Sequence, residues 1–327
     1  MQSVFQIFQI LKEQSVDNSD GGIAVGSIPL IEHHKIGVSA IGQPVFFIKC
    51  EESAKANFLD SSLEFIAVQF NRECQLLNSQ RNIEKGIYTV IYLKTDSIDF
   101  QAYFLEVILL VIKKLPTIPT LQELKIEVEK LIELFSKFSK PPTKTVQGLW
   151  GELFVIAQSK NPAYLIQAWH NSAADKFDFN DGIDKIEVKS TSKTKRIHHF
   201  SIEQLNPNPN SNLIIISVFV VETGVGESIF DLVKQIDDRI QDDDLSFRMN
   251  QIIVQTLGRE ISKSFDMYFD FNLALDSIQF YESEDIPSIA IQNVPDEVIN
   301  VHFDTDLTTV NSIKKIKTKS ILHKSLL

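Results

Sequence analysis

The sequence has very little cysteine, with only Cys50 and Cys74 in 327 residues. Two cysteines are too few for a disulfide framework, and their spacing does not match the paired CxxC ligands of a zinc site. We therefore expect a protein of a reducing compartment, the cytoplasm.

Long apolar runs are missing as well. The longest runs, at 104–112 and 213–221, are much shorter than the roughly 20 residues that a helix needs to cross a bilayer. The first 20 residues have no basic start and no small-residue cleavage site, so they do not resemble a signal peptide. The sequence therefore predicts no membrane partner.

Positive charge is in short supply, because 32 basic residues stand against 43 acidic ones, for a formal net charge of -11. Such a chain has no general attraction to phosphate groups, and any DNA-binding surface has to be a local basic patch. Walker phosphate loops, GxGxxG loops, Ser-His-Asp arrangements and zinc-ligand sets are also missing. These absences argue against nucleotide-dependent, serine hydrolase and zinc enzymes.

The chain is long enough for two domains, and its clearest linker is "SKPPTKT" at 139–145. We place a boundary there, between an N-terminal α+β region at 1–140 and a second domain at 141–327. Strand-like segments dominate up to about residue 95, including a hairpin around Gly42. Apolar periodicity predicts helices at 100–115 and 121–138. The role of this region stays open among DNA recognition, partner binding and a dimer face.

The second domain is expected to begin with a helix at 146–159. The sequence then predicts four strands and a further helix. The strands are expected at 176–180, 184–191, 195–202 and 213–221, and the helix at 227–240. The strand at 213–221 is apolar throughout, as in a strand that is covered on both faces. The predicted order is α, β, β, β, β, α.

The stretch "KFDFNDGIDKIEVKS" at 176–190 alternates apolar and polar residues, which predicts two strands that each have one apolar face. "NDGID" contains an Asp-Gly pair, a strong signal for a tight turn. Either two-residue loop, at 181–182 or 182–183, puts Asp178 on the same side as Glu187 and Lys189. An odd-numbered loop would turn Asp178 to the other face.

Two opposed carboxylates on a strand pair lie roughly 5 Å apart at Cβ and repel one another without a cation. A bound Mg²⁺ would remove that repulsion, because this ion prefers hard oxygen ligands. The ammonium of Lys189 could then orient the attacking water or stabilise charge on a phosphate. An ordinary solvated strand face is the alternative that alternation alone leaves open.

Asp178 in "FDF" and the Glu-x-Lys sequence "IEVKS" resemble the core of the PD-(D/E)XK nuclease superfamily, to which many restriction endonucleases belong. The resemblance implies an α/β fold with a restriction-endonuclease-like core, a mixed sheet of the α-β-β-β-α-β type, in the C-terminal half. The family's proline before the aspartate is missing, since Phe177 stands there.

The family often adds a glutamate on the preceding helix and a glutamine after the Glu-x-Lys strand. Glu152 in "GLWGELFVI" and Gln204 in "HHFSIEQL" match these positions. The resemblance implies that Glu152, Asp178 and Glu187 hold metal. It also implies that Asp178, Glu187, Lys189 and Gln204 are catalytic. Taken alone, Glu152 could be the polar edge of an apolar helix, and Gln204 could bond a loop carbonyl.

A basic cluster follows the proposed site, and we predict that it contacts DNA. Its members are Lys193, Lys195, Arg196 and His198. An ordinary basic turn fits the same residues equally well. The last 17 residues carry five lysines and no acid, and they read as a frayed tail or a basic arm.

The sequence as a whole predicts a Mg²⁺-dependent DNA endonuclease, with Mn²⁺ as the other candidate ion. The whole chain resembles a bacterial group of PD-(D/E)XK-motif proteins, which implies a role in restriction or phage defence. The partners it implies are DNA, a second copy in a homodimer, and an ATPase or methyltransferase of a defence system. The rival interpretation is a catalytically inactive DNA-binding or scaffolding subunit of a defence complex, which the acidic net charge favours.

Overall fold

The computed structural model describes residues 2–15, 23–51, 58–80, 82–170, 175–208, 211–314 and 320–326. They form two compact units, Met1–Lys140 and Pro141–Leu327. Both units mix helices with strands, so the fold is of the mixed α/β kind. Among the described residues, no helix combines the length and the apolar character needed to cross a membrane.

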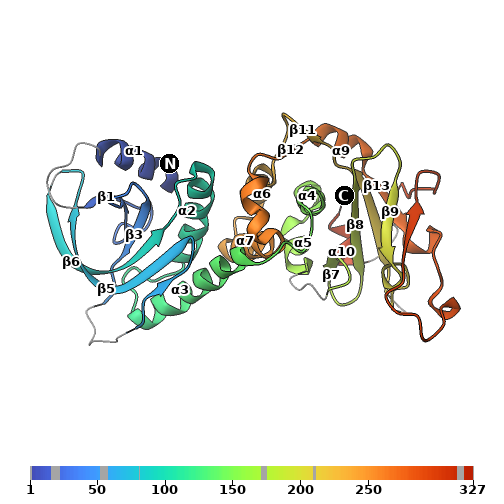
Figure 1. The fold of residues 1–327 in the computed structure, drawn as a ribbon, viewed down its shortest axis with the longest axis horizontal. Helices are drawn as coiled ribbons and strands as arrows, with labels where there is room; N and C mark the ends of the chain where they lie inside the picture. The colour runs from blue at the N-terminus through green and yellow to red at the C-terminus, as the bar shows by residue number, and fades with distance from the viewer. Residues whose placement is uncertain are drawn as a thin grey trace. The chain divides into compact units, whose positions relative to one another are not determined.

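The N-terminal unit is a curved sheet with three helices (Figure 1). Strands β1 to β6 pair in the order β1-β2-β3-β6-β5-β4, and a further parallel pairing of β1 with β5 closes the sheet on itself. The hairpin expected around Gly42 is confirmed by the antiparallel pairing of β2 with β3. The elements are α1 (Val4–Ser15), β1 (Ile23–Ser27), β2 (Lys35–Val38), β3 (Pro44–Ile48), β4 (Ser61–Ser62), β5 (Ile66–Leu77), β6 (Ile83–Leu93), α2 (Ile98–Ile112) and α3 (Leu121–Ser136).

The C-terminal unit is built on a four-stranded sheet in the order β13-β10-β8-β7. Strand β10 runs parallel to β8 and antiparallel to β13, so the sheet is mixed. The elements are α4 (Val146–Gln158), α5 (Pro162–Ala168), β7 (Phe179–Asn180), β8 (Lys185–Thr191), β9 (Ile197–Ser201), β10 (Leu213–Phe219), β11 (Glu222–Thr223), α6 (Ile229–Ile240), α7 (Asp243–Leu257), α8 (Ile261–Ser264), β12 (Tyr268–Phe269), α9 (Phe271–Ser277), β13 (Gln279–Glu282), β14 (His302–Asp306) and α10 (Ile321–Lys324).

Helix α4 packs directly on strand β8, with α5, α6 and α7 on the same side of the sheet (Figure 1). Gly151 lies at this contact, where an added Cβ atom would sit 3.4 Å from Cβ of Ser190, an ordinary van der Waals distance. The side chain of Thr145 caps the helix by accepting from the backbone N–H of Gly148. This packing brings residues of α4 to the edge of the sheet where β7 lies.

Strand β9 does not extend the four-stranded sheet, which differs from the sheet of the α-β-β-β-α-β type expected for the core. It pairs instead with β14, with Phe200 opposite Phe303. The physical reason is burial, because Phe200 is fully buried against Ile215 of β10 and Tyr281 of β13. Strands β9 and β14 therefore cover the face of the sheet that α4 does not.

Candidate active site

The hairpin of β7 and β8 sets the positions of the predicted acids. Phe179 pairs with Ile186 and Asn180 with Lys185, which brings Asp178, just before the strand, to the Glu187–Val188 part of β8. The loop between the strands is even-numbered, as required, but it spans 181–184 rather than two residues. Gly182 takes a positive φ of 90° in it, which a glycine adopts without strain.

Asp178 lies just before β7 and is 4% exposed. Its Oδ2 accepts from the backbone N–H of Val188 at 2.7 Å, which ties the carboxylate to β8. Phe177 does not share the face of Phe179, as strict alternation would require. It packs with Phe200 and Ile215 on the opposite face of the sheet, because the chain bends at 176–178 before the strand begins.

Glu152 projects from α4 and is 2% exposed. Its Oε2 accepts from the indole N–H of Trp169 at 2.7 Å and lies 3.2 Å from Nε2 of His170. Its Oε1 accepts from the ammonium of Lys144 at 2.6 Å. This buried carboxylate therefore has polar partners at both oxygens.

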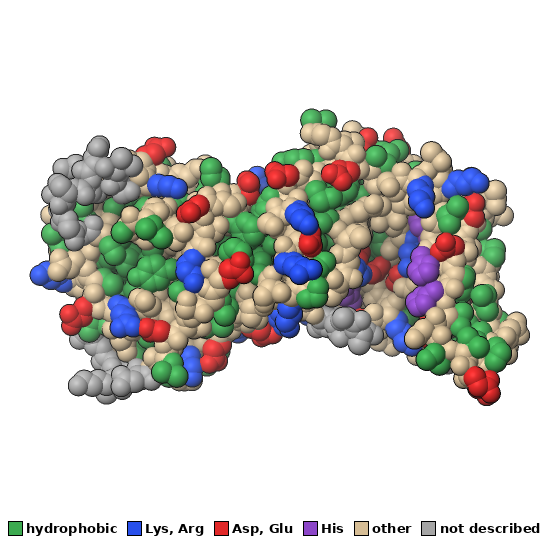
Figure 2. Space-filling view, viewed as in Figure 1, with side chains coloured by type: hydrophobic (Ala, Val, Ile, Leu, Met, Phe, Trp, Pro, Cys, Tyr) green, Lys and Arg blue, Asp and Glu red, His purple; other side chains and the backbone are tan. Residues whose placement is uncertain are grey.

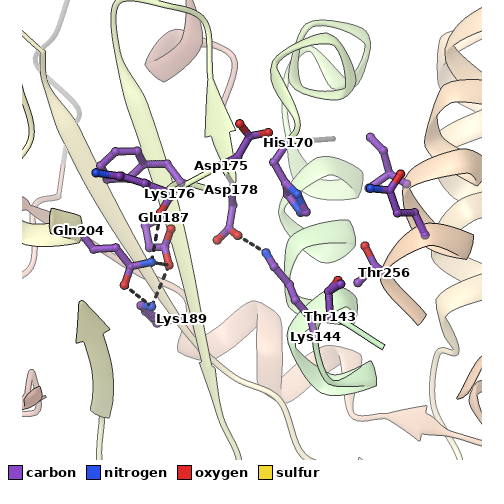
Figure 3. A pocket seen from close by; sticks show the side chains of 13 residues that line it. Thr143, Lys144, His170, Asp175, Lys176, Asp178, Glu187, Lys189, Gln204 and Thr256 are labelled. Carbon is purple, nitrogen blue, oxygen red and sulfur yellow. Dashed lines mark hydrogen bonds and ion pairs between the residues drawn. The ribbon is translucent and has the colours of Figure 1, made fainter. Parts of the chain in front are cut away.

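Lys144 bridges Glu152 and Asp178, donating to an oxygen of each. Figure 3 shows its bond to Asp178. Burial alone would lower the pKa of Lys144, but the carboxylates of Asp178 and Glu152 outweigh it and raise this pKa. Burial alone would raise the pKa of Glu152, but the charges and hydrogen bonds of Lys144 and His170 lower this pKa to about 2. For Asp178, burial and the nearby Glu152 outweigh Lys144 and raise the pKa. The structure thus holds a partly buried cation between two of the three predicted acids.

Glu187, Lys189 and Gln204 form a second group beside Asp178 (Figure 3). The ammonium of Lys189 lies 2.8 Å from Oε1 of Glu187 and donates to Oε1 of Gln204 at 3.1 Å. The amide of Gln204 donates to the same Glu187 oxygen at 2.6 Å. Oε2 of Glu187 is buried and has no hydrogen-bond partner. Burial, followed by the charge of Asp178, raises the pKa of Glu187 to about 7 against the opposing effect of Lys189.

One cavity of about 330 Å³ is lined by members of both groups, namely Lys144, Asp178, Glu187, Lys189 and Gln204, together with His170 and Thr256. Glu152 is not among the lining residues but bonds two that are, Lys144 and His170. Potential ligand atoms of Glu152, His170 and Asp178 lie within 4.8 Å of one another. Glu187 lines the same cavity but is not a member of that cluster. Such a cavity, with acids on several sides and a lysine at its wall, can take a cation and a phosphate group.

Two residues of this cavity, Lys144 and His170, were not among the predicted site residues. Lys144 lies in the proline-rich linker, where a lysine carries no periodic signal. His170 follows Trp169 directly after α5, a few residues before Asp178. The sequence did offer one signal for His170, because a titratable side chain stands there only a few residues before the predicted catalytic Asp178.

The four residues predicted to contact DNA do not form one surface. Lys193 and Lys195 are exposed. Arg196 is 6% exposed and His198 is 3% exposed. Arg196 donates to the hydroxyl oxygen of Ser217, and Nε2 of His198 is hydrogen-bonded to the same hydroxyl at 2.7 Å. The structure therefore argues against DNA contact by Arg196 and His198, because their polar groups are used inside the protein.

Basic side chains are dispersed rather than gathered on the face drawn in Figure 2, where acidic ones lie among them. The basic C-terminal segment is in part a packed element and not a frayed tail. Nε2 of His323, in α10, lies 2.9 Å from the backbone carbonyl oxygen of Lys185. Its lysines at 315, 317 and 319 lie outside the described residues.

Comparison with known proteins gives a match to a family model. The model described as "Putative PD-(D/E)XK family member, (DUF4420)" matches residues 20–308. Among curated proteins and solved structures, nothing matches the chain. The match spans most of the chain, including the cavity residues Asp178, Glu187 and Lys189 and the neighbouring Glu152. On this match, the chain belongs to the DUF4420 family of the PD-(D/E)XK nuclease superfamily.

Proposed function

We propose that this protein is a metal-dependent DNA endonuclease that hydrolyses phosphodiester bonds. The observation that carries the proposal is the cavity lined by Asp178, Glu187 and Lys189. Glu152 lies next to it and is joined to Asp178 through Lys144. Membership of a PD-(D/E)XK family supports it, because these residue types match the family's catalytic motif. The burial of these acids argues against the alternative of an ordinary solvated strand face, which would leave them exposed.

The residues present fit a divalent cation. Glu152 and Asp178 already share one cation, the ammonium of Lys144, and Oε2 of Glu187 is a buried acceptor without a partner. Carboxylate oxygens of this kind suit Mg²⁺ or Mn²⁺. Glu152, Asp178 and Glu187 would hold the ion. When bound, it would lower the pKa of water and neutralise charge on the phosphate.

Lys189 is positioned to act on the reacting groups. Glu187 and Gln204 hold its ammonium from two sides, and its Nζ lies 4.9 Å from the centre of the Phe200 ring. In hydrolysis, a water oxygen bonds to phosphorus and loses a proton, while the bond from phosphorus to the 3′ oxygen breaks. That oxygen takes up a proton, which leaves a 5′ phosphate and a 3′ hydroxyl. Lys189 orients the water and stabilises the charge that builds on the phosphate.

The DNA partner and the biological setting follow from the proposal and the family resemblance. Lys193 and Lys195 are exposed cations near the end of β8 that can meet phosphates. Because the net charge is -11, we propose that a second copy in a homodimer, or a defence-system ATPase or methyltransferase, adds to the affinity for DNA. A cytoplasmic role in restriction or phage defence belongs to the same proposal.

A plasmid-nicking assay with Mg²⁺ or Mn²⁺ tests the proposal. We expect the wild type to nick the plasmid and Lys189→Ala to lose activity. Lys185→Ala is the matched control. Lys185 precedes Glu187 by two residues, as Lys189 follows it by two, so both lysines lie on the same face of β8. The ammonium of Lys185 donates to Ser211, and neither residue lines the cavity. Equal cleavage by wild type and Lys189→Ala would refute the assigned mechanism. No cleavage together with no binding of either ion would favour the inactive scaffolding subunit.

A further inference from the structure

His170 lies beside Asp178 because the chain after α5 runs along the edge of the sheet. Trp169 forms an antiparallel bridge with Phe179, and the backbone N–H of His170 donates to the carbonyl oxygen of Asp178 at 2.9 Å. This register places His170 opposite Asp178. Side chains that are directly opposed in an antiparallel pair lie on the same face, with Cβ atoms roughly 5 Å apart. Figure 3 shows the imidazole on the cavity side, near Lys144 and Asp178.

Two hydrogen-bond donors, the backbone N–H of Val188 and the indole N–H of Trp169, fix the two carboxylates that flank this imidazole. Val188 holds Oδ2 of Asp178, and Trp169 holds Oε2 of Glu152, each at 2.7 Å. The remaining oxygens, Oδ1 of Asp178 and Oε1 of Glu152, both point to the ammonium of Lys144. The protein therefore defines one cation position with two oriented oxygens. Lys144 can leave that position, because 31% of its side chain is exposed.

The imidazole adds a nitrogen to this position. Ligand atoms of Glu152, His170 and Asp178 lie within 4.8 Å of one another, and the side chain of His170 is only 11% exposed. A second observation points to a cation here, since the unpartnered buried Oε2 of Glu187 belongs to the same cavity. Mg²⁺ takes oxygen ligands, whereas first-row transition ions also bind imidazole well.

We infer that His170 is a direct metal ligand with Glu152 and Asp178, and that the site takes a first-row transition ion such as Mn²⁺ in preference to Mg²⁺. This inference rests on the proposed function and names the ion class of the same site. Lys144 is the resident cation that the ion replaces. His170 binds through its unprotonated Nε2, the nitrogen that faces Glu152.

Calorimetric titration of the full chain with MnCl₂ and with MgCl₂ tests the selectivity. We expect the wild type to bind Mn²⁺ at least about tenfold more tightly than Mg²⁺. His170→Asn should lose most of that preference, because it removes the imidazole while keeping a polar side chain. The matched control is His199→Asn, since His199 is exposed on β9 and bonds Asp304. Circular dichroism establishes that each variant is folded.

Electron spin echo spectroscopy of the Mn²⁺-loaded wild type gives a readout that needs no variant. Coupling of Mn²⁺ to a ¹⁴N nucleus supports imidazole ligation, and its loss in His170→Asn assigns it. An equal ratio of Mn²⁺ to Mg²⁺ affinity in wild type and His170→Asn, or Mn²⁺ bound without ¹⁴N coupling, would overturn the inference. Cleavage activity that survives such a result would leave the proposed nuclease function standing. A wild type that binds neither ion would refute both.

Discussion

The ammonium of Lys144 lies 2.6 Å from Oε1 of Glu152, a carboxylate that is only 2% exposed. The same ammonium pairs with Asp178, so one lysine contacts two buried acids. Without a cation, these two buried carboxylates would repel one another. Lys144 thus stabilises a site whose acids are arranged for binding a cation.

Replacing Lys144 with methionine should lower the free energy of unfolding of the C-terminal unit by about 3 kcal/mol, because it leaves two buried carboxylates without their cation. Both tryptophans, Trp150 and Trp169, lie in this unit, so urea unfolding followed by tryptophan fluorescence reports its stability. Added Mn²⁺ should restore part of the loss, since an ion that binds only the folded state stabilises it.

The matched control for this prediction is Lys193→Met, which removes an exposed lysine from the same unit. It should change the unfolding free energy by less than about 0.5 kcal/mol. A Lys144→Met protein as stable as this control would show that the two carboxylates do not need Lys144.

Asp178 and Glu187 line one cavity, and their closeness was predictable because period-two alternation and an even loop are local properties of "KFDFNDGIDKIEVKS". The position of β9 was not, because it depends on Phe200 meeting Phe303, about a hundred residues later in the chain. Arg196 was misread for a similar reason, since its partner Ser217 lies on another strand. Local patterns predict which face a residue takes, whereas distant contacts decide what covers that face.

Replacing Gln204 with leucine should slow DNA cleavage about 10- to 100-fold, the range typical of residues that orient a metal ligand. The leucine removes the donor to Glu187 and the acceptor for Lys189, so both side chains lose their alignment. Single-turnover cleavage at saturating Mn²⁺ measures the effect. Glu203→Gln, one residue away and outside the cavity, should cleave at the wild-type rate. A wild-type rate for Gln204→Leu would contradict the role assigned to Gln204.

Lys193 and Lys195 should contribute to DNA affinity through phosphate contacts. Each alanine substitution should reduce the slope of log affinity against log salt by about one, because one fewer counterion is released on binding. Fluorescence anisotropy with labelled duplex DNA, in the presence of Ca²⁺ and over a range of salt, gives this slope. An unchanged slope in the Lys193→Ala, Lys195→Ala double variant would place the DNA on another surface.

His198 should make the stability of the C-terminal unit depend on pH. Burial, helped by Lys189 and Arg196, lowers its pKa from 6.5 to about 4 in the folded protein. The unfolded chain therefore binds more protons than the folded one between these values, so stability falls as the pH drops from about 6.5 to about 4. The His198 contribution to this loss should reach about 3 kcal/mol. It should be missing in His198→Gln and retained in His199→Gln, whose exposed imidazole serves as the control. Urea unfolding at several pH values measures it, and an identical pH profile for wild type and His198→Gln would show that His198 is not the buried neutral group.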